Sequence, residues 1–196
     1  MEQQNKRPTA VFEDKPVGHV HEFYLSGEIE DPEKYTEWFD KIRHAPANDA
    51  IKIYINSCGG SIWTALQFMR AMKESKATIV VSVEGACLSA ATIILLMGDK
   101  YEITPHSVFM FHNYSGGTMG KGGEMADQIN HQRGWSEKLF REVYQDFLTC
   151  DEIKAIMDNK DIWLSSEDVL GRLNKLMKAR QKKVRAALGR RKRSSC

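Results

Sequence analysis

The stretch GACLSAATIILLMG (residues 85–98) joins a long apolar run to a single hydroxyl, Ser89, which stands where that run begins. Glycines bound the stretch, and Ile93 to Leu96 are residue types that protein cores bury. A hydroxyl that is buried without a hydrogen bond costs free energy, so Ser89 needs a partner. Three interpretations are open for it: a small buried residue, a helix cap, or a nucleophile.

The composition is that of an ordinary globular domain. The chain has 196 residues, of which 42% are hydrophobic and 28% are charged. Its longest apolar run, Thr92 to Met97, is far shorter than the roughly 20 residues that span a bilayer, and residues 1–17 contain no apolar signal segment. We therefore expect a cytoplasmic protein. The four cysteines form no CxxC pair and are expected to be free thiols.

Charge divides the chain unevenly. Between Arg172 and Arg193 there are eleven Lys or Arg residues and no acid, whereas residues 1–171 carry a net charge of −9. This predicts a polar N-terminal segment (1–18), a folded domain (19–176) and a basic, flexible tail (177–196). The tail has two candidate partners, nucleic acid phosphates and the acidic body of a neighbouring subunit. Nucleic acid is not favoured, because no aromatic residue interleaves the charges for base stacking.

Strand and helix patterns alternate along the first half of the chain. Strands are predicted over 21–29, 50–57, 76–85 and 107–113, and helices over 31–43, 61–75 and from residue 89. Asp31 and Ser61 are the expected caps of the first two helices. A glycine-rich arm, a long helix over 124–148, a short helix near 151–157, a strand IWLS and a helix from Ser166 follow. This order predicts an α/β fold with a largely parallel sheet.

Three turns follow predicted strands and so meet at one edge of such a sheet, where sites form. They are NSCGGS (56–61), the turn that carries Ser89, and the end of SVFMFH, which places His112. A serine becomes a nucleophile when a histidine, oriented by a carboxylate, takes its proton. Asp161 is the best placed carboxylate, with Asp158 and Asp99 as alternatives. No GxSxG motif is present, and the residues alone leave a serine hydrolase as one interpretation among several.

Taken together, these segments resemble the proteolytic subunit of Clp protease, ClpP. INSCGGS resembles that family's oxyanion turn, GACLSAATIILLMG its nucleophile segment, FMFHNYSGG its histidine strand and DIWLSSEDV its aspartate segment. The resemblance runs from about residue 22 to 170 in the family's order. It implies a ClpP/crotonase-like fold with a Gly-rich handle and long helix (about 114–148), so that residues 19–176 are expected to form a ClpP-like peptidase domain.

The resemblance also implies roles for individual residues. Ser89 would attack the scissile carbonyl, His112 would shuttle the proton, Asp161 would hold the imidazole, and the backbone N–H groups of Gly59 and Ala90 would bind the oxyanion. The implied function is serine endopeptidase activity on polypeptides, without a cofactor or metal ion. It would take place inside paired heptameric rings that an ATP-driven unfoldase serves.

Several positions depart from the family's pattern. Cys58 stands where proline is expected, Ala90 and Ala91 replace Met-Gly, and Asn113 replaces glutamine. The connection DKYEITPHS (99–107) is slightly short, which we expect to affect only a surface turn. The N-terminal segment does not resemble the family's axial loop, so docking to an unfoldase is in question. Such divergence is similar to that of ClpP-like proteins encoded by bacteriophages, whose location would be the host cytoplasm.

Three other functions compete with this interpretation. A crotonase-type acyl-CoA enzyme would share the fold but needs no Ser-His-Asp set, and a degenerate ring subunit would act only as a scaffold. A signal-peptide peptidase would need a Ser–Lys pair and a membrane anchor. His19 and His21 could face one side of a strand as metal ligands, but no third ligand accompanies them. His106 and His131 are expected to be surface or structural residues.

Overall fold

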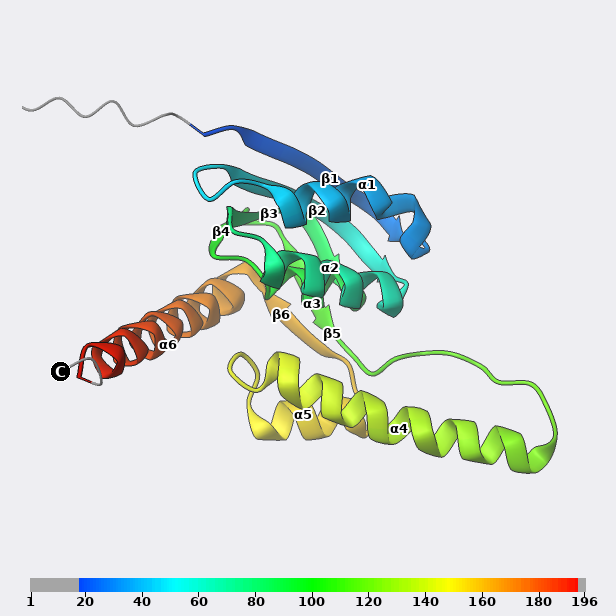
Figure 1. Cartoon of the computed structure of the whole chain (residues 1–196). Coiled ribbons are helices and arrows are strands. Elements are labelled where there is room, and N and C mark those ends of the chain that lie inside the picture. The colour runs from blue at the N-terminus through cyan, green and yellow to red at the C-terminus, as the bar shows by residue number, and fades with distance from the viewer. Residues whose placement is uncertain (1–17, 194–196) are drawn as a thin grey trace, which may run out of the picture.

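The computed structural model describes residues 18–193 and contains one six-stranded sheet (Figure 1). Its strand order is β1-β2-β3-β5-β6, with β4 also paired to β3. Every pairing is parallel except that between β5 and β6. The predicted α/β fold with a largely parallel sheet is therefore confirmed. The strands are β1 (Val20–Ile29), β2 (Ala50–Gly60), β3 (Thr78–Leu88), β4 (Lys100–Ile103), β5 (Val108–Phe111) and β6 (Ile162–Ser165).

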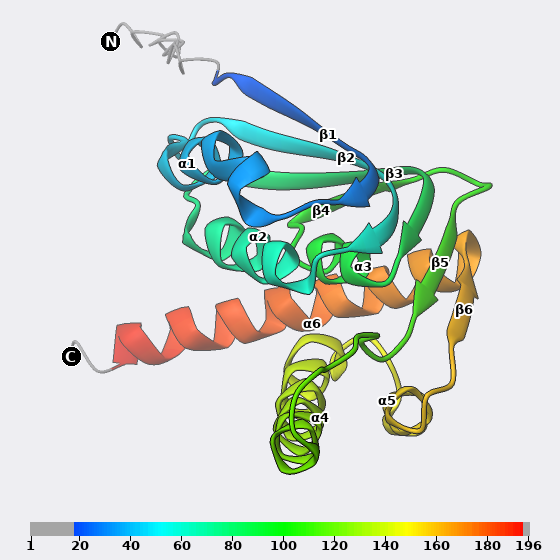
Figure 2. The same ribbon diagram turned by 90° about the vertical axis from the view of Figure 1, so that its right-hand side faces the viewer.

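Helices separate all consecutive strands except β4 and β5, and α1, α2 and α3 pack against one face of the sheet (Figure 2). The helical elements are η1 (Pro32–Tyr35), α1 (Thr36–His44), α2 (Ile62–Glu74), α3 (Ala90–Leu95), α4 (Gly122–Tyr144), α5 (Cys150–Met157) and α6 (Ser166–Arg193). Ser61 caps α2 as expected, because its Oγ accepts a hydrogen bond from the Thr64 N–H.

The core lies between the sheet and these three helices. Alternate residues of β2, Ile51, Ile53 and Ile55, are fully buried, as the period of two in a strand requires. Phe39 of α1 and Phe68 of α2 meet edge to face with ring centroids 4.8 Å apart. This packing fixes the carboxyl ends of β2 and β3, from which two of the candidate site turns emerge.

Three local predictions were wrong. Asp31 makes no side-chain cap bond, and the helix predicted over 31–43 begins as the 3₁₀ turn η1 before α1. The connection at 99–107 is more than a surface turn, since Lys100–Ile103 pairs with β3 as strand β4. The long helix α4 ends at Tyr144, before the predicted residue 148, because the chain turns there to enter α5.

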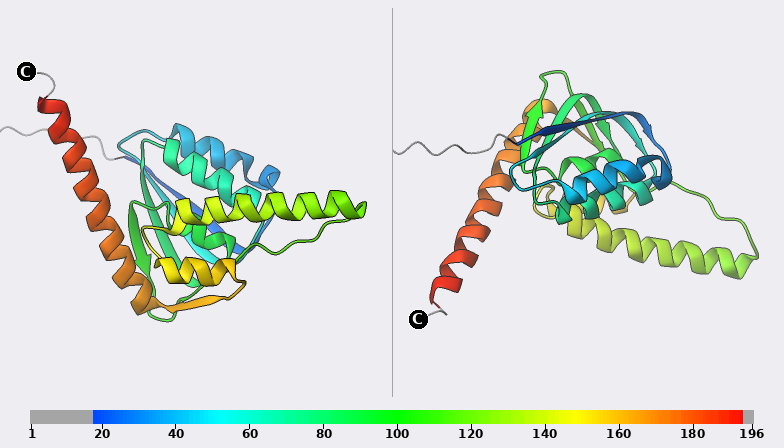
Figure 3. Two further views of the ribbon diagram at one scale, coloured as in Figure 1. Left: turned by 90° about the horizontal axis from the view of Figure 1, so that it is seen from below. Right: turned by 45° about the horizontal axis from the view of Figure 1, so that its top comes forward.

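Two segments project from the body in different directions (Figure 3). One is α4 with the extended connection that precedes it, in the place of the predicted handle. The other is α6, which runs as one helix through the boundary that the sequence suggested at residue 177. The predicted division into domain and flexible tail stays a prediction. Residues 1–17 of the predicted N-terminal segment lie outside the described residues.

Candidate active site

The turn between β3 and α3 holds Ser89 in a backbone conformation that L-residues rarely adopt. Its φ is 55° and its ψ is −125°, a combination that costs about 1–3 kcal/mol. The Ser89 N–H donates to the Met110 carbonyl at 2.8 Å, and the Thr92 hydroxyl donates to the Ser89 carbonyl at 2.6 Å. Ser89 makes no side-chain cap bond, so the cap interpretation is wrong. The strained turn leaves its hydroxyl facing a cavity.

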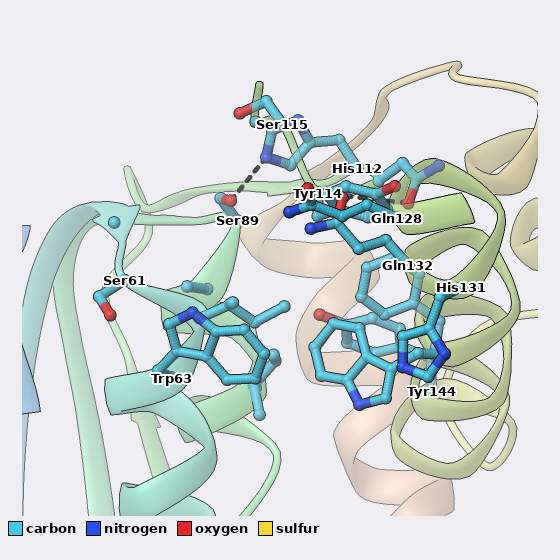
Figure 4. Close-up of a pocket in the computed structure, with 18 residues that line it drawn as sticks. Ser61, Trp63, Ser89, His112, Tyr114, Ser115, Gln128, His131, Gln132 and Tyr144 are labelled. Carbon is cyan, nitrogen blue, oxygen red and sulfur yellow. Dashed lines mark hydrogen bonds between the residues drawn. The ribbon is translucent and has the colours of Figure 1, made fainter. Parts of the chain in front are cut away.

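His112 meets this hydroxyl because β5 pairs with the end of β3. Leu88 lies opposite Met110 in the parallel register, so the residue that follows β5 comes to lie beside Ser89. The His112 Nε2 and Ser89 Oγ atoms are 2.6 Å apart (Figure 4). A serine hydroxyl at this distance can donate its proton to an unprotonated imidazole nitrogen.

Asp161 lies on the other side of the imidazole, at a longer distance. Its Oδ1 is 4.0 Å from the His112 Nδ1, too far for a hydrogen bond, and its side chain is 51% exposed. Among residues 18–193, it is nonetheless the only carboxylate with an oxygen within 4.0 Å of a nitrogen of this ring. The alternative Asp99 accepts the Ile79 N–H at 2.9 Å, and Asp158 forms the C-cap of α5. The structure thus brings Asp161 near the pair without closing the contact.

The two glycines at the end of β2 lie close to Ser89, but they differ from each other. A Cβ on Gly59 would lie 2.7 Å from the Ser89 Cβ, so only glycine fits there. Its N–H, however, donates to the Ser57 hydroxyl at 3.1 Å. The expectation that the Gly59 N–H is free for an oxyanion is therefore wrong for this conformation.

Gly60 is better placed than Gly59 to donate to a bound substrate. It lines the cavity beside Ser89, whereas Gly59 does not. In the ladder with β1, the Ser61 N–H donates to the Ile29 carbonyl at 2.8 Å, and Gly60 is the residue paired with Ile29. Because bonding alternates along a parallel ladder, the Gly60 N–H points away from β1. The Ala90 N–H is the first of α3, and such groups have no acceptor within their helix.

A cavity of about 590 Å³ opens beside Ser89, between the sheet edge and α4 (Figure 4). Trp63 of α2 and Trp135 of α4 pack against each other in its lining, with ring centroids 5.2 Å apart. Gln128, His131 and Gln132 of α4 form its polar wall. His131 is exposed, as expected for a surface residue, and it also lines the cavity.

A buried pair of hydroxyl groups connects the turn that carries Ser89 to α4. The Thr92 Oγ1 lies 2.8 Å from the hydroxyl of Tyr144, which is 2% exposed. Burial raises the pKa of Tyr144 far above its usual range, so the phenol stays protonated. The base of α4 therefore positions the turn that carries Ser89.

Sequence reasoning missed the contributions of Trp63, Trp135 and Tyr144. Trp135 falls within the long helix predicted over 124–148, but a helical pattern cannot tell a core residue from one that lines a cavity. Trp63 directly follows the glycine turn, and this adjacency was the available signal. The Thr92–Tyr144 contact joins residues 52 positions apart and has no local pattern.

Comparison with known proteins shows the family of this chain. The family model for Clp protease matches residues 22–172. The chain belongs to the Clp protease family. It is 28% identical over 173 residues to the ATP-dependent Clp protease proteolytic subunit of Leuconostoc citreum strain KM20. This match covers 83% of this chain and 82% of the Leuconostoc protein. The chain is also 28% identical over 152 residues to the subunit of that name from Borreliella afzelii strain PKo, with 75% and 77% covered.

The proteolytic subunit of Bacteroides fragilis strain YCH46 is 29% identical over 130 residues, covering 63% of this chain. The match spans 56% of that Bacteroides protein. Membership of the Clp protease family makes the chain a serine-type endopeptidase, as the sequence predicted, and favours this activity over the crotonase-type alternative.

Neither a metal site nor a membrane-spanning helix is found in the described part of the chain. Within residues 18–193, no three His, Cys, Asp or Glu side chains are grouped to hold a metal ion. The His21 ring instead pairs with Asp49, at 2.7 Å between Nε2 and Oδ2. Over the same residues, no helix combines the length and apolar character needed to cross a bilayer.

Proposed function

We propose that Ser89, His112 and Asp161 form a catalytic triad that hydrolyses peptide bonds. The observation that carries this proposal is the 2.6 Å contact between the His112 Nε2 and a serine held in a strained turn. His112 takes the Ser89 proton as the hydroxyl attacks the scissile carbonyl. The histidine then gives that proton to the leaving amine, and water repeats the sequence on the acyl-enzyme.

Two backbone N–H groups stabilise the tetrahedral intermediate. The Ala90 N–H supplies one donor, and we propose the Gly60 N–H as the other, in place of Gly59. Gly59 keeps a structural role, because its lack of a Cβ lets the turn reach Ser89. Loss of one such donor typically reduces the rate on the order of 10²–10³-fold.

Asp161 holds the imidazole tautomer and stabilises the imidazolium that forms during the reaction. The 4.0 Å separation requires a shift of about 1 Å to reach hydrogen-bond distance. Half-exposed Asp161 has room to move, and the family's assembly into rings supplies a cause for such a shift.

The substrates are polypeptides, and the apolar part of the cavity, which Trp63 and Trp135 line, receives a side chain near the scissile bond. Paired heptameric rings with an interior chamber are the assembly that the family suggests. The curated relatives are named ATP-dependent, which supports an unfoldase partner. A cytoplasmic location and a bacteriophage origin stay predictions.

A fluorophosphonate probe tests the triad directly, since it forms a covalent bond with an activated serine. We expect labelling of the wild type and none of Ser89→Ala or His112→Ala. Ser115→Ala is the matched control, because Ser115 lines the same cavity but, among the described residues, makes no hydrogen bond to His112. Labelling that persists in Ser89→Ala would refute the assignment. An assembled but unlabelled wild type would indicate the scaffold alternative.

A further inference from the structure

Helix α6 has two faces of opposite character. Val169, Leu173 and Leu176 are buried against the body, with at most 3% of each side chain exposed. One turn further along, the Arg180 guanidinium donates to the carbonyls of Leu96 and Gly98 at 2.7 and 3.0 Å. These residues recur at spacings of three or four, so they form the docked face of the helix.

The other face of α6 is a stripe of positive charge. Lys175, Lys178, Lys182 and Arg185 follow one another at spacings of three or four, and all four are exposed. Within residues 18–193 none of them has an ion-pair partner, while Lys183, on the docked side, pairs with Asp146. We call these four residues the basic stripe. Like charges at such spacings destabilise an isolated helix, so the stripe gains from an acidic partner.

An acidic surface lies at the opposite end of the molecule. Glu28, Glu30, Asp31, Glu33 and Glu37, at the end of β1 and along η1 and α1, are all exposed. None of them forms an ion pair within the described residues. We call these five residues the acidic edge. Figure 1 shows η1 at the right of the molecule and the end of α6 at the left.

We propose that the basic stripe of one subunit docks on the acidic edge of a second copy of this chain. Two complementary surfaces at opposite ends of one molecule form a head-to-tail contact, and such contacts generate closed rings when the rotation closes. The acidic edge cannot reach the stripe of its own chain, so the contact joins subunits. The proposal deepens the assembly proposed above by naming the residues that select the neighbour.

Nucleic acid is the competing partner for the stripe. Phosphates would satisfy the positive charges equally, but would leave the five carboxylates of the acidic edge without a role. A second copy satisfies both surfaces at once. The observed separation of charge therefore favours self-association.

A charge swap tests this contact by particle mass, independently of peptidase activity. We expect Lys178→Glu, Lys182→Glu and Arg185→Glu together to raise the protein concentration needed for assembly at least tenfold at low salt. Adding Glu30→Lys, Asp31→Lys and Glu33→Lys to that chain recreates the complementarity with reversed signs, and assembly should return towards the wild type. Analytical ultracentrifugation measures both shifts, and circular dichroism verifies that each variant is folded.

The matched control makes the same charge change elsewhere. Lys76, Lys138 and Lys154 are exposed and have no ion-pair partner within the described residues, so their replacement by Glu should leave assembly unchanged. Assembly that is unaffected by reversing the stripe overturns the proposal. It is also overturned if the combined swap fails to restore assembly, or if stripe reversal removes only RNA or DNA binding. If the fluorophosphonate does not label the fully assembled wild type, that result contradicts the proposed triad and leaves the docking contact unaffected.

Discussion

The two sides of His112 differ sharply in how firmly the fold holds them. On one side, Ser89 lies in a half-buried turn that Met110 and Thr92 hold by backbone and hydroxyl hydrogen bonds, and the contact to the imidazole is 2.6 Å. On the other, Asp161 is half exposed and lies 4.0 Å away. A single chain thus brings the proposed nucleophile and base into contact, whereas the proposed third member of the triad has to move by about 1 Å to reach the imidazole.

The largest expected effect comes from removing the negative charge of Asp161, the more distant partner of His112. Asp161→Asn keeps the shape but removes the charge that stabilises the imidazolium, so we expect kcat to fall about 10²–10⁴-fold in assembled protein. Asp158→Asn is the matched control and should stay near the wild type. In protein diluted below assembly, wild type and Asp161→Asn should react with fluorophosphonate at similar rates. A large difference in dilute protein would contradict the idea that assembly closes this contact.

An intermediate effect is expected from removing the Thr92 hydroxyl, which holds the turn that carries Ser89. Thr92→Val preserves volume but leaves the buried Tyr144 hydroxyl without its partner, which costs about 1–3 kcal/mol of unfolding free energy. Chemical denaturation measures this loss. Labelling of Ser89 should also slow, because the Thr92 hydroxyl no longer holds the Ser89 carbonyl.

The double variant Thr92→Val with Tyr144→Phe sharpens this test. Removing both hydroxyls leaves no unpaired polar group, so part of the lost stability should return. Strictly additive losses in the two single variants and the double variant would show that the hydroxyls do not act as a pair.

The smallest effect concerns the helices that flank the segment carrying Asp161. Arg172 of α6 binds Glu152 of α5 through two bonds of 2.7 and 2.8 Å and lowers the Glu152 pKa to about 2. Because the folded pKa is depressed, this stabilisation is present above the usual carboxyl pKa and is lost as the pH falls towards about 2. Glu152→Gln should lower the melting temperature by a few degrees near neutral pH and flatten its decline in acid. Melting curves from pH 7 to pH 2 measure this, with the exposed Glu167→Gln as control.

The elements of the sheet and the candidate residues could be predicted from local patterns. Alternating apolar residues in 50–57 specify a strand because side chains alternate across a sheet, and Ser61 is a cap because its hydroxyl satisfies an orphan N–H. Strand β4 escaped prediction, since KYEI is too short and too polar to stand out from a loop. The sequence also did not predict that α6 is docked on the body as far as Arg180, because Arg180 cannot be distinguished by sequence from the other basic residues around it.

The sequence by itself determined the α/β order and, through its motifs, the family and the three residues proposed for catalysis. The tertiary structure alone decided how they meet. The register of β3 against β5 brings Ser89 to His112, and the hydrogen bond to Ser57 takes the Gly59 N–H out of the oxyanion role expected for it. The positive φ of Ser89 also appears only in the folded chain. Motifs record residue types along the chain, whereas distances, hydrogen-bond partners and strain arise from contacts between segments far apart in sequence.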